Sequence, residues 1–235
     1  MSKSGVIPPQ AFDSVRAMRE RIEGQRPPRR YFLIVCEGEK TEPNYFESIR
    51  ALLPSEMVDR VTVEGCGRNT RSLVDFARDK NQKRLSSDKP YYYHIWVVFD
   101  KDSFPDDDFD NAIKQLEALD LATSSNEDKR QRWHAAWSNE AFELWYILHF
   151  QETTGGALSR STYQGSLETL IKKHCGVIRP YQKNAKDMFS LLREYTPDAI
   201  RRAKTALGQQ TGKPPHAQNP ATTVHQLVEE LLRYI

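Results

Sequence analysis

The chain has 235 residues, of which 38% are hydrophobic and 28% charged, and its net charge is +2. It contains no run near the ~18 apolar residues that a membrane span requires and no apolar N-terminal segment typical of secretory signals, so we expect a cytoplasmic protein with no membrane partner. Its three cysteines are widely spaced and form no Cys-x-x-Cys pair, which argues against a structural zinc site.

The residue pattern divides the chain into three parts. Residues 1–30 are polar, arginine-rich and interrupted by proline pairs, which predicts a basic, partly flexible N-terminal arm. Residues 31–150 alternate between strand and helix patterns, which predicts an α/β domain with a mostly parallel sheet flanked by helices. Residues 151–235 show only helical patterns, so we expect a helical C-terminal portion packed on this domain. The expected strands are 31–37, 58–64, 92–99 and 132–137, and the expected C-terminal helices are 164–174, 184–194, 197–207 and 222–234.

Capping residues mark the expected starts of several helices. Thr41 is the expected N-cap of the helix that follows the first strand, and Ser138 with Asn139 is expected to cap an apolar helix over 140–150. The three aspartates at 106–108 open another helix, where their position favours interaction with the helix dipole over metal binding.

Carboxylates follow the two clearest strands. Glu37 ends the strand at 31–37, and Asp100 and Asp102 follow the strand at 92–99. In open α/β sheets ligands bind at the carboxyl edge of the strands, and alternate residues of an extended chain point to the same side. We therefore expect these three carboxylates to converge on Mg²⁺ or Mn²⁺, hard cations that prefer oxygen ligands and activate water against phosphodiesters.

Either acidic motif alone is commonly a cap or a surface charge, but their occurrence together on successive strands favours a site. Glu42 lies one helical turn beyond Glu37 and is a further candidate metal ligand, whereas Glu39 is attributed to the turn. Lys101 is expected to neutralise nearby charge rather than to contact phosphate.

The charge is unevenly distributed along the chain. Residues 91–130 hold ten Asp or Glu against four Lys or Arg, whereas residues 155–235 hold twelve Lys or Arg against six Asp or Glu. An acidic region beside a basic one suits a metal-dependent enzyme that acts on a polyanion. Ordinary solvated helix faces explain the pattern equally well. Four basic residues are candidate contacts for nucleic acid, although a solvated surface is the preferred interpretation of each one: Arg68, Arg71, Lys183 and Lys186.

The helix expected over 140–150 is apolar on nearly every side, so a buried Glu143 must be paired or functional to offset the cost of its burial. The preferred interpretation is that Glu143 is hydrogen-bonded within the core and that Asn139 caps the helix. In the functional alternative, both residues border the metal site from the fourth strand.

The block Glu37-Gly-Glu-Lys-Thr-Glu42 and the strand end Phe99-Asp-Lys-Asp102 resemble the Toprim fold, which topoisomerases, primases and some nucleases share. More specifically, residues 30–235 resemble the RloB-like family. Glu140 stands where this resemblance leads us to expect Pro, which affects only the start of that helix. The other motifs of the resemblance are Ser138-Asn139, Phe142-Glu-Leu-Trp145, Leu148-His-Phe150, Tyr181-Gln-Lys183, Asn219-Pro220 and Thr222-Thr-Val224.

The resemblance implies a bacterial protein of antiphage defence or abortive infection, commonly encoded beside an RloA-type ATPase partner. It implies that Glu37 is the Toprim glutamate, a metal ligand or general acid/base, and that Asp100 and Asp102 are the Toprim acidic pair; Glu42 and Glu143 are carried over less directly. The leading hypothesis is a Mg²⁺-dependent nuclease acting on DNA or RNA, tRNA included. The alternative is a non-catalytic subunit of a defence complex that binds or senses a nucleotide or nucleic acid. Topoisomerase activity is not expected, because no tyrosine-nucleophile domain is present.

Overall fold

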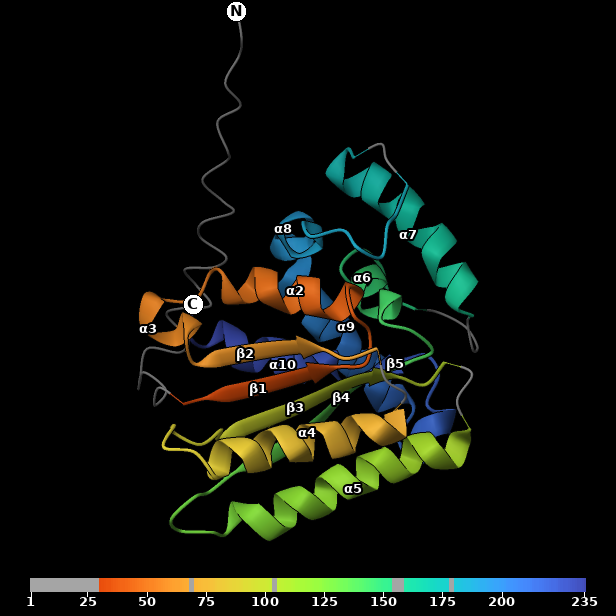
Figure 1. Ribbon diagram of the computed structural model, residues 1–235. Helices are drawn as coiled ribbons and strands as arrows, with labels where there is room; N and C mark the ends of the chain where they lie inside the picture. The colour runs from red at the N-terminus through yellow and green to blue at the C-terminus, as the bar shows by residue number, and fades with distance from the viewer. Residues whose placement is uncertain (1–29, 68–69, 103–104, 154–158, 178–179) are drawn as a thin grey trace, which may run out of the picture.

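The structure, a computed structural model, describes residues 30–67, 70–102, 105–153, 159–177 and 180–235. Its strands form one sheet in the order β2–β1–β3–β4–β5 (Figure 1). The first four strands are parallel, as predicted, whereas β5 runs antiparallel to the end of β4. The strands are β1 (Phe32–Cys36), β2 (Val61–Gly65), β3 (His94–Asp100), β4 (Arg132–Asn139) and β5 (Ala221–Thr222).

Helices cover both faces of this sheet, which confirms the α/β class and the C-terminal helices (Figure 1). Helices α4 and α5 pack on one face, and α2, α6 and the C-terminal helices pack on the other. In the described part of the chain, no helix is both long and apolar enough to span a bilayer. The helices are α2 (Thr41–Arg50), α3 (Ser55–Val58), α4 (Thr70–Leu85), α5 (Asp106–Ser124), α6 (Glu143–Leu148), α7 (Arg160–Cys175), α8 (Met188–Leu192), α9 (Thr196–Gln209) and α10 (Val224–Leu232), with 3-10 turns η1 (Arg193–Tyr195) and η2 (Pro215–Ala217).

Strand β1 is buried on both faces because its residues alternate between two cores. Phe32, Ile34 and Cys36 face the core that β1 shares with α2 and the C-terminal helices, while Leu33 and Val35 face the core under α4 and α5. Fully burying a large aliphatic or aromatic side chain stabilises the fold by about 1.5–3 kcal/mol. An entirely apolar strand is therefore most stable between two other strands of a parallel sheet, as β1 is between β2 and β3, and this position determines where the next residues emerge.

Two expectations about the ends of elements were wrong. The part of the chain after residue 150 is not solely helical, because Ala221 and Thr222 form β5, a strand too short to show any alternation. Ser138 and Asn139 do not cap a helix: they continue β4 and pair with β5, and α6 begins only at Glu143. The intervening Asn139–Glu140 peptide bond is cis, at the position where the family resemblance leads us to expect Pro.

The N-terminus of α2 is not capped by Thr41 either. Lys40 occupies the N-cap position without a side-chain cap, and Thr41 Oγ1 donates instead to the main-chain oxygen of Lys183 at 3.0 Å. The carboxylate of Glu42 accepts the N–H groups of Gly38 and of Glu42 itself. An acid side chain thus satisfies donors that the first helical turn leaves free.

Candidate functional site

Glu37 leaves β1 at the carboxyl edge of the sheet and reaches toward β3. Its N–H donates to the oxygen of Val98 at 2.9 Å, and its Oε2 accepts the N–H of Asp100 at 3.0 Å. The parallel register places Cys36 opposite Val98, so the residues that follow the two strands meet at one edge of the sheet. The structure therefore brings Glu37 and Asp100 together.

An arginine bridges Asp100 and Asp102. Nη2 of Arg160, the first residue of α7, donates to Asp100 Oδ2 at 3.1 Å, and Nη1 donates to Asp102 Oδ2 at 2.7 Å. The Asp102 backbone is left-handed, with a φ of 39°, and its N–H donates to the oxygen of Glu140 at 3.0 Å. Aspartate adopts this conformation more readily than most residues do, so the turn after β3 directs both aspartates toward one cation.

Two further carboxylates are buried beside this pair. The residues Glu42 and Glu143 are 5% and 3% exposed, and both raise the pKa of Asp100. Glu143 Oε1 accepts hydrogen bonds from Gln164 Nε2 at 3.0 Å and from the Tyr181 hydroxyl at 3.3 Å. Glu143 is thus a hydrogen-bonded glutamate in the core, as the preferred interpretation expects, and its charge also acts on Asp100. We call the following set the acid cluster: Glu37, Glu42, Asp100, Asp102 and Glu143.

Burial is the largest cause of the raised pKa of three acids in the cluster, Glu37, Glu42 and Asp100. It raises the pKa of Glu37 to about 7, opposed by the hydrogen bond from the N–H of Asp100 and assisted by the Glu42 charge. Burial also raises the pKa of Glu42 and of Asp100, and neighbouring carboxylates add to both shifts. The guanidinium of Arg160 lowers the pKa of all three groups. A buried cluster of this kind is stabilised by any cation that it can hold.

Two of the predicted residues make contacts outside the acid cluster. Lys101 Nζ forms an ion pair with Asp106 at 3.0 Å, so its charge neutralises an acid at the start of α5. Asn139 Nδ2 donates to the main-chain oxygen of His216 at 2.7 Å. Asn139 therefore connects the end of β4 to the turn η2, and its side chain neither caps a helix nor contacts an acid there.

The predicted basic contacts are only partly described. Lys183 and Lys186 belong to residues 180–187, which we call the strap because α2 holds them through main-chain oxygens. Thr41 donates to the oxygen of Lys183, and Ser48 Oγ donates to the oxygen of Lys186 at 2.8 Å. The side chains of both lysines are exposed beside α2. Arg68 and the side chain of Arg71 lie outside the described residues.

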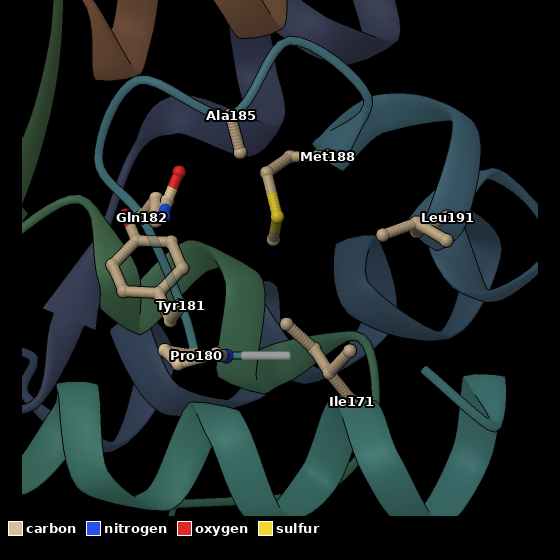
Figure 2. Close-up of a pocket in the computed structure, with 7 residues that line it drawn as sticks. All are labelled: Ile171, Pro180, Tyr181, Gln182, Ala185, Met188 and Leu191. Carbon is tan, nitrogen blue, oxygen red and sulfur yellow. The ribbon is translucent and has the colours of Figure 1, made fainter. Parts of the chain in front are cut away.

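A small pocket lies between α7, the strap and α8, and Figure 2 shows the side chains that surround it. Its volume of about 20 Å³ has room for roughly one water molecule. The Tyr181 ring lines it, and the Tyr181 hydroxyl reaches Glu143. The pocket is thus too small for a substrate. The lining residues are Ile171, Pro180, Tyr181, Gln182, Ala185, Met188 and Leu191.

The donor chemistry of the acid cluster fits Mg²⁺ or Mn²⁺, since both ions prefer carboxylate oxygens. The arrangement of these donors is different. Among the described residues, no three His, Cys, Asp or Glu side chains are positioned to hold a metal ion, and the Oδ2 atoms of Asp100 and Asp102 bind Arg160. An ion bound through these Oδ2 atoms must therefore displace the guanidinium.

Sequence reasoning missed Arg160. The residue follows Asp100 by sixty positions, and nothing in its own helix pattern indicates which element it faces. One signal was available: a cation in the first turn of a helix opposes the helix dipole, so its position there suggests an acidic partner elsewhere in the fold.

Residues 32–231 match the family model described as "RloB-like protein". The chain belongs to the RloB-like family. The RloB-like match spans the whole acid cluster, Arg160 and the strap. Neither the curated proteins nor the solved structures include a match to the chain.

Proposed function

We propose that this RloB-like chain is a Toprim-type nuclease that hydrolyses phosphodiester bonds of DNA or RNA with the help of Mg²⁺ or Mn²⁺. The observation that carries the proposal is the meeting of Glu37 and Asp100 at the carboxyl edge of paired parallel strands, with three more carboxylates around them. Buried acids at this edge are costly for folding, and a role in binding a cation explains why the chain has them.

Each residue of the acid cluster has a role in this proposal. Glu37, Asp100 and Asp102 would hold the ion, with Glu42 as a further ligand, and the bound ion would supply an activated water and stabilise developing negative charge. Instead of holding the ion, Glu37 could act as the general acid/base, since its pKa of about 7 suits proton transfer at neutral pH. Glu143 would orient its neighbours through its bonds to Gln164 and Tyr181.

The biological setting is inferred from the family. We propose that the chain acts in antiphage defence or abortive infection in the bacterial cytoplasm, together with an RloA-type ATPase. The exposed Lys183 and Lys186 on the strap are candidate contacts for the phosphates of the nucleic acid.

The test is a cleavage assay with phage DNA, plasmid and total tRNA, each with and without Mg²⁺ or Mn²⁺. We expect cleavage only with metal, and no cleavage or phage protection by Glu37→Ala or Asp100→Ala. Glu39→Ala is the matched control, because Glu39 is an exposed acid in the same turn and should keep full activity. Unchanged cleavage by both cluster variants would contradict the nuclease function.

The bridge made by Arg160 favours a second candidate function. The guanidinium of Arg160 and the exposed strap lysines are cations that can recognise phosphate without metal, which suits a non-catalytic subunit that binds a nucleotide or nucleic acid. Thermal unfolding distinguishes the two functions. A chain that gains no stability from Mg²⁺ or Mn²⁺, and cleaves nothing with its ATPase present, is the binding subunit.

A further inference from the structure

The guanidinium of Arg160 spans two carboxylates with an incomplete set of hydrogen bonds. One N–H donates to Asp100 and one to Asp102, while the buried Nε has no partner among the described residues. Arg132 shows the more complete arrangement, in which Nε and Nη2 bind the two oxygens of Asp120 at 2.8 and 3.1 Å. Arg160 therefore joins the two acids of an Asp-x-Asp pair, as a metal ion does, rather than forming a saturated ion pair.

The acid cluster holds more negative charge than Arg160 neutralises. Five carboxylates lie around one guanidinium, and the nearby Lys101 is paired with Asp106. Glu42 and Glu143 both raise the pKa of Asp100, but the ion pairs that Arg160 forms within the described part of the chain are with Asp100 and Asp102. A doubly charged ion would balance this cluster better than a guanidinium does.

The position of Arg160 is explained by the acids and not by its helix. A cation at the N-terminus of α7 opposes the helix dipole, so its contacts with Asp100 and Asp102 must outweigh that cost. Gln164, one turn further on the same face, donates to Glu143. The helix itself is anchored by the fully buried Tyr163, while the side chain of Arg160 is 31% exposed and has a path to solvent.

We propose that Arg160 is the built-in counter-ion of the acid cluster, which competes with a divalent cation for Asp100 and Asp102 and, once displaced, binds a phosphate of the substrate at the same edge. The competition depends only on the acids that Arg160 contacts. The phosphate-binding step rests on the proposed nuclease function, and a guanidinium is well suited to it because its planar donors match phosphate oxygens.

The test is the affinity of the metal-free protein for Mn²⁺, measured by calorimetry on Arg160→Gln and the wild type. We expect Arg160→Gln to bind Mn²⁺ about tenfold more tightly, which corresponds to removal of one ion-pair competitor. At saturating Mn²⁺ the same variant should cleave nucleic acid at least about tenfold more slowly, because the phosphate contact is lost. Arg132→Gln is the matched control: it also removes a paired arginine, but at the start of β4, and should leave Mn²⁺ affinity unchanged.

The opposite directions of these two effects separate the proposal from a purely structural role, which would weaken both. Unchanged or weaker Mn²⁺ binding by folded Arg160→Gln overturns the competition. If that variant does not fold, Arg160→Lys is used, and tighter Mn²⁺ binding than in the wild type is again required, because a lysine cannot bridge two carboxylates in this planar geometry. If the Arg160 variant binds Mn²⁺ more tightly but neither it nor the wild type cleaves nucleic acid, the competition is supported. That result overturns only the nuclease function.

Discussion

The two ends of the same parallel strands bury titratable groups of different kinds. The carboxyl edge holds the acid cluster, in which Arg160 forms an ion pair with Asp100 and another with Asp102. Toward the amino edge, His94 and His134 lie in contact, with Nδ1 and Nε2 3.3 Å apart. His94 stacks on Phe32 with ring centroids 4.7 Å apart, and His134 stacks on Trp96 at 4.2 Å.

Burial favours the neutral form at both edges, but the consequences differ. It lowers the pKa of His94 to about 3 and that of His134 to about 4, so both imidazoles are neutral at pH 7 and satisfy one another. It raises the pKa of Glu37 only to about 7, so at neutral pH the acid cluster keeps charge that its surroundings disfavour. The two histidines bond to one another, whereas we propose that an added cation stabilises the acid edge.

The largest expected effects come from one substitution at each edge. Asp100→Asn should reduce cleavage about 10³-fold. It should change the free energy of unfolding by less than about 1 kcal/mol, because the amide removes repulsion between carboxylates and Arg160 keeps its ion pair with Asp102. His94→Ala should reduce the free energy of unfolding by about 2–4 kcal/mol through lost packing and leave cleavage per folded molecule unchanged. Urea unfolding and cleavage assays on both variants measure these two effects. A loss of cleavage in folded His94→Ala would contradict the expectation that only the carboxyl edge serves cleavage.

The convergence of acids was predictable because it follows from strand direction alone. Apolar runs before Glu37 and Asp100 indicate buried parallel strands, and parallel strands end at one edge whatever the rest of the fold does. The contribution of Glu143 was less predictable, because an apolar helix with one acid is compatible with either a core or a site role. Its hydrogen bond from Gln164 fits the core role, and its effect on the pKa of Asp100 leaves the site role a prediction.

The parts that escaped prediction depend on contacts between distant segments. Arg160 reaches Asp100 from a helix beyond the α/β portion, and a sequence pattern carries no direction for a single side chain on the first turn. Thr41 and Asn139 have the residue types of helix caps, but tertiary partners at Lys183 and His216 take their hydrogen bonds instead. Capping preferences are local and weak, so such contacts readily override them.

The pH dependence of stability should differ in sign between the edges. Glu37 has a folded-state pKa of about 7 against an ordinary value of 4.5. Between these values the folded state binds more protons than the unfolded state, so stability falls as pH rises from 4.5 to 7. The lowered pKa values of His94 and His134 act oppositely, and their contribution grows as pH rises from about 3 to 6.5.

Comparing Glu37→Gln with the wild type isolates the acid term, because the histidines are common to both proteins. Without metal, the two proteins should have similar free energies of unfolding at pH 4.5, and Glu37→Gln should become more stable by up to about 3 kcal/mol above pH 7. Urea unfolding at a series of pH values measures the difference. A constant difference across this range would mean that Glu37 titrates normally and that the two edges are electrostatically alike.

The smallest expected effect tests how closely the backbone approaches the acid cluster. Gly38 donates its N–H to the Glu42 carboxylate, and a Cβ on Gly38 would overlap Glu42 Oε2. Gly38→Ala should therefore displace that carboxylate, lower the free energy of unfolding by about 1–2 kcal/mol and weaken Mn²⁺ binding. Gly208→Ala in α9 is the control, since no atom lies within 4 Å of its Cβ, and it should stabilise the chain by up to about 1 kcal/mol. Stabilisation by both substitutions would show that Glu42 is not held against the turn after β1, and would leave the acid edge with one ligand fewer than proposed.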